Sequence, residues 1–569
     1  MKLDGRHIIC QSLVNEGVHT VFGHPGGAIL DLYDVLPEFP IRHILVRHEQ
    51  GAAFGADGYA RATGDVGVCF ATSGPGATNL VTGLANAYMD SSAVVAITGQ
   101  VPTSLIGRDA FQEIDTTGIT LPITKHNYLV KDVRDLPRIM KEAFHIARTG
   151  RRGPVLIDVA KDVFTAETEF EFHTKVHLPG YRPTGSGNMR QIRAAAAVIN
   201  RAKRPVILAG QGVIASGAFD QLRELAEKAQ IPIITTLLGI GSIRETHPLA
   251  FGMIGLHGLW HNNYAVTHSD VVIGLGMRFD DRVTRKLADF APHAHVVHVD
   301  IDPAEISKNV LAHTPVVGDA KLVLTQLLPE VHEARHDDWV GQINEWKREH
   351  PLETPEPSVP MTQQWAIKEL SDVTQGQASI VTDVGQHQMW AAQHYTYDRL
   401  NSWFTAGGLG AMGFGLPAAM GVAVARPEEQ VWALLGDGGF MMTVQEMATI
   451  VEENIPVKIV IMNNSALGMI RQWQNMLYKS NYVAAHFHKN PDFVKLAEAF
   501  GMPAWRAKSP VDLASAYRAA AEHDGPCLID VIVDEVPNVY PMVRAGAGIA
   551  EMDEADRTRV LVPTSAEEY

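Results

Sequence analysis

The chain has 569 residues, of which 46% are hydrophobic and 20% are charged, the composition of a soluble globular protein. This length exceeds what one hydrophobic core can organise and favours about three or four domains. Lys and Arg number 48 against 64 Asp and Glu, so the net charge is −16. This acidic excess argues against nucleic acid or an anionic membrane as a partner, because no surplus of basic residues exists to neutralise phosphates.

The three cysteines indicate buried thiols rather than disulfides or a metal site. Cys69 and Cys527 each lie in an apolar, strand-like run, at residues 66–71 and 526–533. Such thiols fit a reducing cytoplasm. The N-terminus leads straight into an amphipathic helical pattern without signal character, and no apolar run approaches the roughly 18 residues of a membrane span. We therefore expect a cytoplasmic protein.

The first part of the chain alternates short apolar strands with helical patterns. Strands are expected at residues 20–23, 41–46, 66–71, 93–98 and 154–159. We therefore assign residues 1–165 to a parallel α/β domain. Residues 166–190 lose this rhythm and mix charge with Pro and Gly, which indicates a linker.

The alternation returns in a second unit, residues 191–330. Its strands are expected at residues 205–209, 231–235, 270–275 and 295–299. Residues 331–360 are polar and end in several prolines, which favour extended chain over helix in a second linker. Residues 361–540 form a third unit, and residues 541–569 a tail that either closes over the site or is disordered. The expected fold class is thus α/β, with three doubly wound parallel-sheet domains.

The third unit contains a stretch that looks like a diphosphate and metal clamp. A buried strand leads into the turn Gly436-Asp437-Gly438-Gly439, and Thr443 with Glu446 forms a capping box that starts a helix. A second strand follows and ends in Asn463-Asn464. Asp437 and Asn464 therefore fall at the carboxyl ends of parallel strands, where open α/β sheets bind ligands.

A carboxylate and an amide oxygen at this edge, together with substrate phosphates, suit Mg²⁺, which binds oxygen and needs few protein ligands. The pattern resembles the thiamine diphosphate (ThDP) motif, in which the metal bridges the cofactor's pyrophosphate to the protein. The resemblance implies Asp437, Asn464 and the backbone carbonyl of Ala466 as metal ligands. The alternative is an ordinary strand, turn, helix and strand with a glycine-rich turn.

A second candidate site contains Glu49, which follows a strand and opens a helix of small residues. On its residues alone, Glu49 serves equally well to complement the positive end of that helix. Glycine-rich turns at residues 23–27 and 72–79 present backbone N–H groups toward a ligand. With residues 54–61 between them, these turns resemble the pyrimidine-binding domain of acetohydroxyacid synthase (acetolactate synthase) catalytic subunits, a family of ThDP-dependent enzymes.

This resemblance spans nearly the whole chain and implies roles for single residues. Glu49 would hydrogen-bond the aminopyrimidine ring and favour the tautomer that deprotonates the thiazolium carbon C2, a task for a carboxylate with a tuned pKa. Gly27 and Gln112 would complete the catalytic group. Met412 would bend the cofactor, although Met is also a common core residue. The implied ThDP contacts are His24, Pro25, Glu49, Thr72, Pro75, Asn79, Gly385, Gln386, His387, Gly410, Met412, Gly436, Asp437, Gly438, Gly439, Asn464, Leu467, Gly468, Met469 and Ile470.

The implied substrate contacts are Phe111, Lys161, Arg282, Met469 and Trp473. Trp473 is characteristic of the family, where it shapes the pocket of the second 2-ketoacid. Because apolar contact rewards one methylene by roughly 1–3 kcal/mol, Trp473 would favour 2-ketobutyrate over pyruvate as acceptor. Without the resemblance, Trp473 reads as a buried core aromatic and Lys161 as a solvated loop cation.

The second unit resembles the family's FAD-binding domain through residues 255–258, 274–284 and 299–303. Two arginines there can neutralise a pyrophosphate, and carboxylates can accept ribose or adenine donors. The alternative is a solvated charge cluster. In the family the flavin is structural, and the implied FAD contacts are Arg151, Gly210, Gln211, Gly212, Thr236, Leu237, Leu256, His257, Gly276, Arg278, Asp280, Arg282, Asp300, Ile301 and Asp319.

The resemblance implies a transferase that uses ThDP, Mg²⁺ and FAD, decarboxylates pyruvate, and ligates the hydroxyethyl unit to pyruvate or 2-ketobutyrate in branched-chain amino acid biosynthesis. The active site would lie between subunits of a homodimer or homotetramer, with a separate regulatory small subunit. The rivals are another ThDP and FAD enzyme (pyruvate oxidase, glyoxylate carboligase or a 2-ketoacid decarboxylase) and a non-catalytic nucleotide-binding paralogue. The chain departs from the family at His24, often Tyr, and at Arg285, often Gly.

Overall fold

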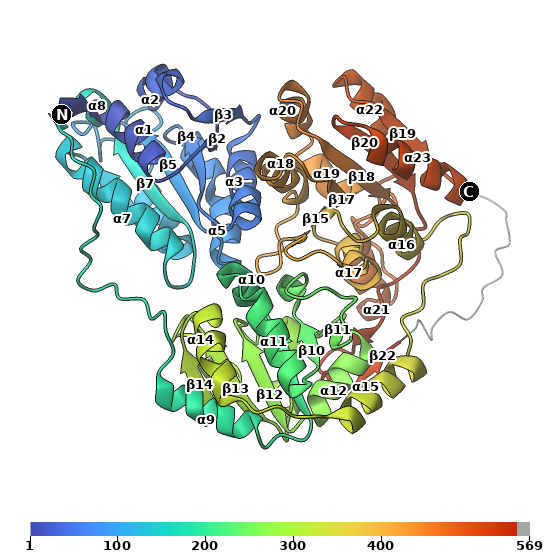
Figure 1. The fold of residues 1–569 in the computed structure, drawn as a ribbon. Coiled ribbons are helices and arrows are strands. Elements are labelled where there is room, and N and C mark those ends of the chain that lie inside the picture. The colour runs from blue at the N-terminus through green and yellow to red at the C-terminus, as the bar shows by residue number, and fades with distance from the viewer. Residues whose placement is uncertain (1, 555–569) are drawn as a thin grey trace.

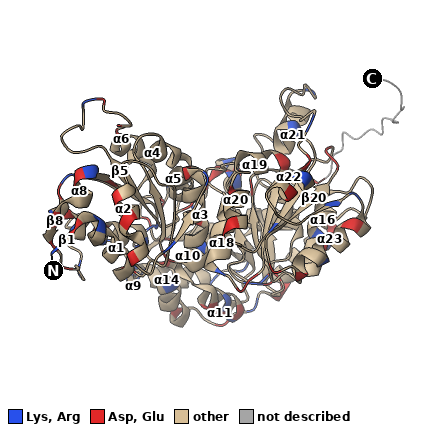
Figure 2. Ribbon diagram, turned by 90° about the horizontal axis from the view of Figure 1, so that it is seen from above, with Lys and Arg blue, Asp and Glu red and all other residues tan. Residues whose placement is uncertain are grey.

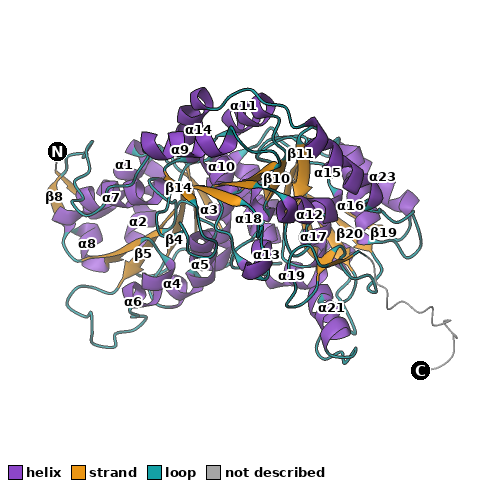
Figure 3. Ribbon diagram, turned by 90° about the horizontal axis from the view of Figure 1, so that it is seen from below, coloured by secondary structure: helices purple, strands orange, loops and turns teal. Residues whose placement is uncertain are grey.

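The computed structural model describes residues 2–554 and contains three six-stranded parallel sheets, each in its own α/β domain (Figure 1). In Figure 1 the N-terminal domain runs from blue to cyan, the middle domain from green to yellow, and the C-terminal domain from yellow to red. Helices cover both faces of the sheets (Figure 3). The expected α/β class with three parallel-sheet domains is confirmed.

The N-terminal sheet has the strand order β3-β2-β4-β5-β7-β6, with all neighbours parallel. Its strands are β2 (Thr20–Gly23), β3 (Arg42–Leu45), β4 (Gly67–Ala71), β5 (Val94–Gln100), β6 (His126–Val130) and β7 (Val155–Ala160). Its helices are α1 (Gly5–Asn15), α2 (Leu30–Val35), α3 (Glu49–Thr63), α4 (Pro75–Asn79), α5 (Val81–Met89), α6 (Thr116–Thr120), α7 (Leu136–Arg148) and α8 (Lys161–Thr165). An antiparallel pair, β1 (Lys2–Asp4) and β8 (Glu167–Glu169), joins the start of the chain to the segment after α8.

The middle sheet has the order β11-β10-β9-β12-β13-β14, again parallel throughout. Its strands are β9 (Pro205–Ala209), β10 (Ile233–Thr235), β11 (Ala250–Met253), β12 (Val271–Leu275), β13 (His295–Asp300) and β14 (Thr314–Val317). Its helices are α9 (Met189–Ile199), α10 (Gln211–Ser216), α11 (Phe219–Ala229), α12 (Trp260–His268), α13 (Asp281–Thr284), α14 (Ala320–Leu327) and α15 (Asp337–Glu349).

The C-terminal sheet has the order β16-β15-β17-β18-β20-β19. Its strands are β15 (Ser379–Thr382), β16 (Trp403–Phe404), β17 (Val431–Gly436), β18 (Val457–Asn463), β19 (Ala504–Ala507) and β20 (Cys527–Ile532). Its helices are α16 (Gln363–Thr374), α17 (Gln386–His394), α18 (Gly415–Ala425), α19 (Asp437–Met442), α20 (Glu446–Glu452), α21 (Gly468–Leu477), α22 (Phe493–Ala499) and α23 (Pro510–Glu522). Every residue of β18 is buried, as expected of a central parallel strand covered on both faces.

Helices α3 and α18 join the N- and C-terminal domains along a seam of small residues (Figure 2). A Cβ atom added to Gly58 would lie 2.3 Å from the carbonyl oxygen of Ala418. One added to Gly421 would lie 2.0 Å from the carbonyl oxygen of Gly55. The two helix backbones therefore touch, and any larger side chain at these glycines would force the domains apart.

The segment predicted as an extended second linker contains helix α15. Its Trp339 is buried, and the indole Nε1 donates to the carbonyl oxygen of Pro205 at 3.0 Å. Asp337 and Asp338 in the first turn complement the helix dipole, as does the basic last turn. The prolines that favoured extended chain begin only at Pro351, beyond the end of the helix.

The predicted capping box does not form, although α20 does begin at Glu446. Gln445 is the N-cap residue of α20, and its side chain makes no capping hydrogen bond. Thr443 Oγ1 instead donates to the carbonyl oxygen of Gly413 at 3.0 Å. The side chain of Glu446 leaves its helix and reaches the N-terminal domain. Both side chains of the predicted capping box, Thr443 and Glu446, therefore form hydrogen bonds to distant segments instead of to each other's backbone.

The three cysteines, Cys10, Cys69 and Cys527, are buried and unpaired, which confirms the expected buried thiols. Burial raises the pKa of the Cys527 thiol to about 11, so little reactive thiolate exists at neutral pH. No helix within residues 2–554 is long and apolar enough to cross a membrane.

Candidate functional site

The ends of β17 and β18 bring Asp437 and Asn464 to one edge of the C-terminal sheet. Asp437 is 1% exposed, and its Oδ1 accepts the N–H of Gly438 at 2.9 Å. Asn490 Nδ2 donates to Asp437 Oδ2 at 2.7 Å. Burial raises the pKa of Asp437 to about 6, so a nearby positive charge would favour its ionised form.

This edge offers oxygen ligands of the kind that Mg²⁺ takes: the Asp437 carboxylate, the Asn464 amide oxygen and the Ala466 carbonyl. Asn464 and Ala466 are both buried, and Asn464 Oδ1 accepts the N–H of Ala466 at 3.1 Å. Within residues 2–554 no group of three or more His, Cys, Asp and Glu side chains could hold a metal. A single carboxylate suits a cation that draws its other ligands from phosphates and water.

The glycine turn leaves no room for side chains. A Cβ atom added to Gly438 would lie 2.7 Å from Leu467 Cδ2, and one added to Gly439 would lie 2.7 Å from Asp383 Oδ1. The turn is shorter than predicted, since β17 runs to Gly436 and α19 begins directly at Asp437. The backbone at this edge can therefore approach a ligand closely.

His387 lies beside the same turn. Cβ atoms added to Gly385 and Gly436 would lie 2.9 Å and 3.1 Å from His387 Cε1. Its Nε2 is buried and has no hydrogen-bond partner among the described residues. Burial lowers the pKa of His387 to about 4, so the ring is neutral. A buried nitrogen without a partner beside the clamp fits a group that hydrogen-bonds a ligand.

Helix α21 presents Gly468, Met469, Ile470 and Trp473, with Leu467 as its N-cap residue. Its first turn packs against α17, because a Cβ atom on Gly468 would lie 2.2 Å from Gln386 Oε1. Gln386 Nε2 donates to the side-chain oxygen of a second α21 residue, Gln472, at 2.9 Å. The clamp, α17 and α21 therefore form one packed unit.

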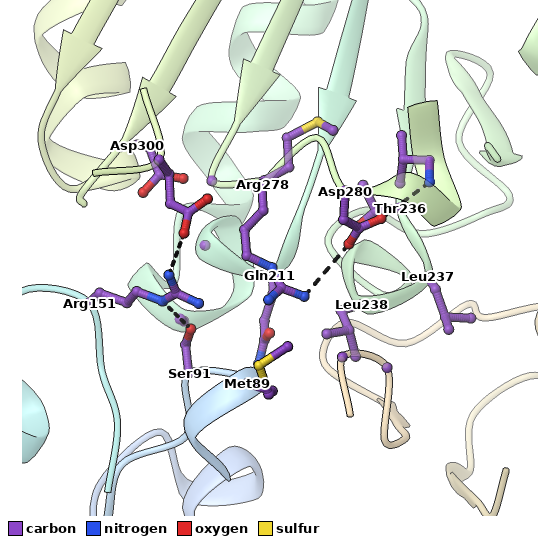
Figure 4. Close-up of a pocket in the computed structure, with 18 of the residues that line it drawn as sticks. Met89, Ser91, Arg151, Gln211, Thr236, Leu237, Leu238, Arg278, Asp280 and Asp300 are labelled. Atoms are coloured by element: carbon purple, nitrogen blue, oxygen red, sulfur yellow. Dashed lines mark hydrogen bonds and ion pairs between the residues drawn. The ribbon is translucent and has the colours of Figure 1, made fainter. Parts of the chain in front are cut away.

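A cavity of about 950 Å³ lies where the three domains meet (Figure 4). Its volume suits a ligand as large as a dinucleotide. The predicted flavin contacts that line it are Arg151, Gln211, Gly212, Thr236, Leu237, Leu256, His257, Gly276, Arg278, Asp280, Arg282, Asp300, Ile301 and Asp319. Gly385, Gly410, Met469 and Trp473 line it from the C-terminal domain. The cavity and the clamp are therefore neighbours.

Gly210 is a predicted flavin contact that does not line this cavity. A Cβ atom added to it would lie 2.3 Å from the carbonyl oxygen of Gly276. The N–H of Gly212 donates to the same oxygen at 3.0 Å, and Gly276 has φ 56°. Gly210 therefore serves the close contact between the loops after β9 and β12.

Charged side chains of both signs face the cavity (Figure 4). Arg151 donates to Ser91 Oγ through Nε at 2.9 Å and to Glu305 Oε1 through Nη1 at 2.8 Å. Arg278 Nη2 lies 3.6 Å from Asp280 Oδ2. Asp300 is 7% exposed, and burial raises its pKa to about 7. Arginines and a buried acid in one cavity fit a ligand with phosphates and hydroxyl donors.

Arg285, a departure from the family pattern, follows α13 with φ 54° and ψ −123°. This backbone region is nearly restricted to glycine. Its Nε is buried and lacks a hydrogen-bond partner within residues 2–554. Burial and the charge of Arg282 lower its pKa. An arginine at position 285 therefore places backbone strain close to Arg282 and Val283, which line the cavity.

Part of the predicted tail closes against the middle domain. Strands β21 (Met542–Val543) and β22 (Met552–Asp553) pair antiparallel, and the N–H of Val543 donates to the carbonyl oxygen of Leu256 at 2.9 Å. Trp473 packs on the apolar cluster that this pair forms with Leu256. Residues 555–569 of the predicted tail lie outside the described residues.

The Glu49 end of the N-terminal domain is a separate cluster. Glu49 is the first residue of α3, is 9% exposed, and accepts from Asn79 Nδ2 through Oε2 at 2.9 Å. A Cβ atom added to Gly76, next to Pro75, would lie 3.3 Å from Glu49 Oε1. The turn at Pro75 and the carboxylate therefore lie in contact.

The two other predicted loops meet beside this cluster. Thr72 Oγ1 accepts the N–H of Ala28 at 3.2 Å, which ties the Pro25 to Gly27 loop to the end of β4. His24 Nδ1 lies 2.9 Å from the carbonyl oxygen of Val46. A Cβ atom on Gly27 would meet no atom within 4 Å. Gly27 therefore faces open space.

The loop between β5 and α6 carries two further predicted residues and projects from the domain (Figure 3). Gln112 has φ 59°, and its carbonyl oxygen lies 2.8 Å from a Cβ atom added to Gly74. Phe111 is 89% exposed, and Lys161 is also exposed. Glu49, Gln112, Phe111 and Lys161 do not line the cavity that Trp473 and Gly410 line. Within one chain the two groups remain apart.

Some residues of the site carried no signal in the sequence. Asn490 contacts Asp437, Ser91 and Glu305 bind Arg151, and Pro183 to Gly185 of the first linker line the cavity. These residues lie in loops without apolar periodicity, where no pattern marks a ligand-facing position. Only Glu305 lies close to a recognised motif, residues 299–303.

The chain matches three family descriptions along its length. They are "Thiamine pyrophosphate enzyme, N-terminal TPP binding domain" at residues 3–119, the central domain at 192–327, and the "C-terminal TPP binding domain" at 383–531. An acetolactate synthase large subunit of Mycobacterium tuberculosis is 48% identical over 98% of this chain and 93% of its own length.

Two further relatives come from distant organisms. A probable acetolactate synthase large subunit of Methanocaldococcus jannaschii is 48% identical over 97% of this chain and 95% of the relative. The acetolactate synthase isozyme 3 large subunit of Escherichia coli is 44% identical over 97% of this chain and 98% of the relative. With all three thiamine pyrophosphate enzyme domains present, the chain belongs to the acetolactate synthase large subunit family of thiamine diphosphate enzymes.

Proposed function

We propose that the chain is the catalytic subunit of an acetolactate synthase, a carboligase that removes CO₂ from pyruvate and transfers the remaining two-carbon unit to a second 2-ketoacid. The acceptor would be pyruvate or 2-ketobutyrate, in the first common step of valine, leucine and isoleucine biosynthesis. One observation carries the proposal: the diphosphate and metal clamp lies next to the part of the cavity wall that Trp473 forms. Trp473 lines the cavity from α21, and the N-cap residue of that helix, Leu467, touches Gly438 of the clamp.

The clamp supports ThDP and Mg²⁺ as cofactors. Asp437, Asn464 and the Ala466 carbonyl would hold the metal, and His387 with the Gly436 turn would face the diphosphate. When bound, ThDP would supply a carbon centre that stabilises the negative charge left by decarboxylation. The remaining ThDP contacts predicted from the sequence form part of this proposal.

Glu49 would accept and return the proton that activates the cofactor, with Gly27 and Gln112 beside it. Its burial and its hydrogen bond from Asn79 support this role, since they hold the carboxylate in a fixed place with little water around it. Arg282 would face the carboxylate of the acceptor. Phe111 and Lys161 would line the approach of the substrates.

The cavity supports a structural FAD. Arg278 and Arg282 would neutralise its pyrophosphate, and Asp300 and Asp319 would accept its hydroxyl or adenine donors. Residues 191–330 would then form the FAD-binding domain. Residues 1–165 would bind the pyrimidine and residues 361–540 the diphosphate and Mg²⁺, with linkers at 166–190 and 331–360.

We also propose that two copies of the chain share the active site. Glu49 and the clamp of one chain do not line a common cavity, so the Glu49 of a second copy would complete the clamp of the first. The minimal unit would be a homodimer, which can pair into a tetramer. Several relatives are named large subunits, which supports a small subunit as a partner. A regulatory role for that subunit and a cytoplasmic location are further parts of this proposal.

One assay tests the proposed reaction. Purified chain, with and without a candidate small subunit, is incubated with pyruvate, ThDP, Mg²⁺ and FAD, and acetolactate, acetaldehyde and peroxide are measured. Acetolactate should dominate. Acetaldehyde as the main product would instead identify a decarboxylase, peroxide a pyruvate oxidase, and no turnover of any 2-ketoacid a non-catalytic paralogue.

A further inference from the structure

A buried glutamate of the C-terminal domain holds the backbone that leads to Glu49. Glu446 is 0% exposed and is the first residue of α20. Its Oε1 accepts the N–H of His48 at 3.0 Å, and both carboxylate oxygens lie 3.2 Å from the N–H of Arg47. These N–H groups belong to the turn between β3 and α3, directly before Glu49.

The same turn of α20 also binds a carbonyl group of this segment. Thr449 Oγ1 donates to the carbonyl oxygen of Leu45 at 2.8 Å and lies 3.4 Å from Glu446 Oε2. Glu446 and Thr449 thus satisfy backbone groups that the strand-to-helix turn leaves without partners of its own. Helix α20 lies next to the end of β3 (Figure 1). The contact joins two domains of one chain.

Gly51 provides the room that the carboxylate needs. A Cβ atom added to Gly51 would lie 2.5 Å from Glu446 Oε1 and 2.7 Å from Glu446 Cδ. Gly51 lies inside α3, where alanine would favour the helix more than glycine does. The small residue is therefore explained by the position of Glu446 rather than by the helix.

The side chain of Glu49 is held separately by Asn79, the last residue of α4. Its orientation thus depends on two supports, one on the preceding backbone and one on its carboxylate. Hydrogen bonds to a charged acceptor are roughly twice as strong as neutral ones, so the support from Glu446 is strongest when its carboxylate is ionised. An error of about 1 Å in the placement of a reacting group can slow a reaction by about 100-fold.

We propose that Glu446 is a positioning residue for Glu49: its carboxylate holds the Arg47 and His48 backbone, and this sets the direction in which the Glu49 side chain points. The proposal rests on the proposed function, in which Glu49 exchanges a proton with the bound cofactor. Because Glu446 is 0% exposed, it would act through Glu49 rather than on a ligand.

Burial raises the pKa of Glu446 to about 7, and the two backbone hydrogen bonds oppose this rise. A neutral glutamine at this position therefore changes the hydrogen bonding more than the charge near pH 7. An amide oxygen in the place of Oε1 can still accept from both N–H groups, but the NH₂ group in the place of Oε2 cannot accept from the N–H of Arg47 and faces it as a second donor.

Three variants separate positioning from stability. Glu446→Gln removes one acceptor, and Gly51→Ala displaces the carboxylate while strengthening the helix. Glu452→Gln is the matched control, because Glu452 lies on the same helix and contacts the Arg47 guanidinium rather than its backbone. Its side chain is 56% exposed.

Four measurements are made on each variant of the full chain. In the cofactor-free protein, hydrogen exchange of the backbone amides of residues 46–52 is followed by mass spectrometry. In the holoenzyme, exchange of the cofactor's C2 proton is followed by NMR after acid quench, together with the affinity for ThDP and the thermal midpoint.

We expect Glu446→Gln to speed amide exchange in residues 46–52 and to slow C2 exchange about 10- to 100-fold, with the affinity for ThDP little changed. Gly51→Ala should also slow C2 exchange, and its gain in helix propensity should offset part of the stability that is lost when the carboxylate is displaced. Glu452→Gln should match the wild type. C2 exchange at the wild-type rate in Gly51→Ala would overturn the proposal, even where Glu446→Gln fails to fold.

The proposed reaction and the positioning role can fail separately. A wild-type chain that exchanges the C2 proton but forms no acetolactate refutes the reaction, while the variants still decide the role of Glu446. A wild-type chain that binds ThDP and shows no C2 exchange above that of the free cofactor refutes both.

Discussion

The cavity and the Glu49 cluster differ in how much of each a single chain provides. The cavity has walls from all three domains and from the first linker, and its charged residues already hold one another in place. Around Glu49, by contrast, Gly27 faces open space and Phe111 is 89% exposed. The difference teaches that one chain encloses the cavity by itself, whereas its Glu49 cluster stays open on one side, where the proposed second copy would supply a further wall. Binding and catalysis should therefore separate by mutation.

The largest effect should come from Glu49→Gln, which removes the acid and base but keeps the shape. C2-proton exchange should fall about 10²- to 10⁴-fold, because a positioned proton-transfer group contributes that much. Affinity for ThDP and the flavin absorbance should stay close to those of the wild type. An unchanged exchange rate would refute the role given to Glu49, and loss of flavin would mean that the two regions are not separable.

A smaller effect is expected at Trp473, which borders both the cavity and the tail pair. Trp473→Leu should lower the preference for 2-ketobutyrate over pyruvate about tenfold, since apolar contact with one methylene is worth roughly 1–3 kcal/mol. The measurement is the ratio of the two products formed when both ketoacids compete. A preserved ratio would show that Trp473 is a packing residue only.

The cavity should also make the stability of the flavin-free chain depend on pH. Burial raises the pKa of Asp300 from its usual value of 3.8 to about 7, so between these values the folded chain holds a proton that the unfolded chain has released. The free energy of unfolding should therefore fall as the pH rises from about 4 to about 7. Asp300→Asn should remove about 1 kcal/mol or more of this fall.

Urea unfolding at pH 5 and pH 8 measures the Asp300 effect. Asp281→Asn is a suitable control, because Asp281 also lines the cavity but its side chain is 77% exposed. Equal pH slopes in Asp300→Asn and the wild type would show that the acid is not held protonated by the cavity.

The smallest effect is expected from Arg285→Gly. This substitution relieves a backbone conformation that costs on the order of 1–3 kcal/mol in a residue other than glycine, although glycine also gains freedom in the unfolded chain. The free energy of unfolding should rise by about 1 kcal/mol, with flavin binding retained. A lower stability would show that Arg285 makes a contact that outweighs its strain.

Strands that consist of a continuous apolar run can be predicted from the sequence, because parallel strands are buried on both faces and need apolar side chains on both. Residues 20–23 and 205–209 match β2 and β9 as they stand. The edge strand β14, with Pro315 inside it, lacked such a run and was missed. Helix α15 was missed because the prolines after it dominated the interpretation of its segment.

The site divides in the same way. Motifs that depend on a short stretch of sequence can be located from their spacing. Examples are the glycine turn with Asp437, and Asn464 at the end of the next strand. Positions defined by contacts between domains could not: the Thr443 and Glu446 pair has the sequence of a capping box, yet both side chains bind other segments. The strand order of each sheet could not be predicted from individual segments either, because it depends on contacts between residues that are distant in sequence.

The seam between α3 and α18 has a consequence for motion. Gly58 and Gly421 place the two helix backbones in direct contact. The interface therefore has no free space that would let the two domains slide or rotate against each other. The N- and C-terminal domains should then move as a single rigid body. Opening of the cavity would occur by displacement of the middle domain, which is connected to them by residues 170–188 and 350–362 outside regular helices and strands, and it would have to break the contact of the tail with Leu256. Ligand entry and release should accordingly depend on the flexibility of these two connections.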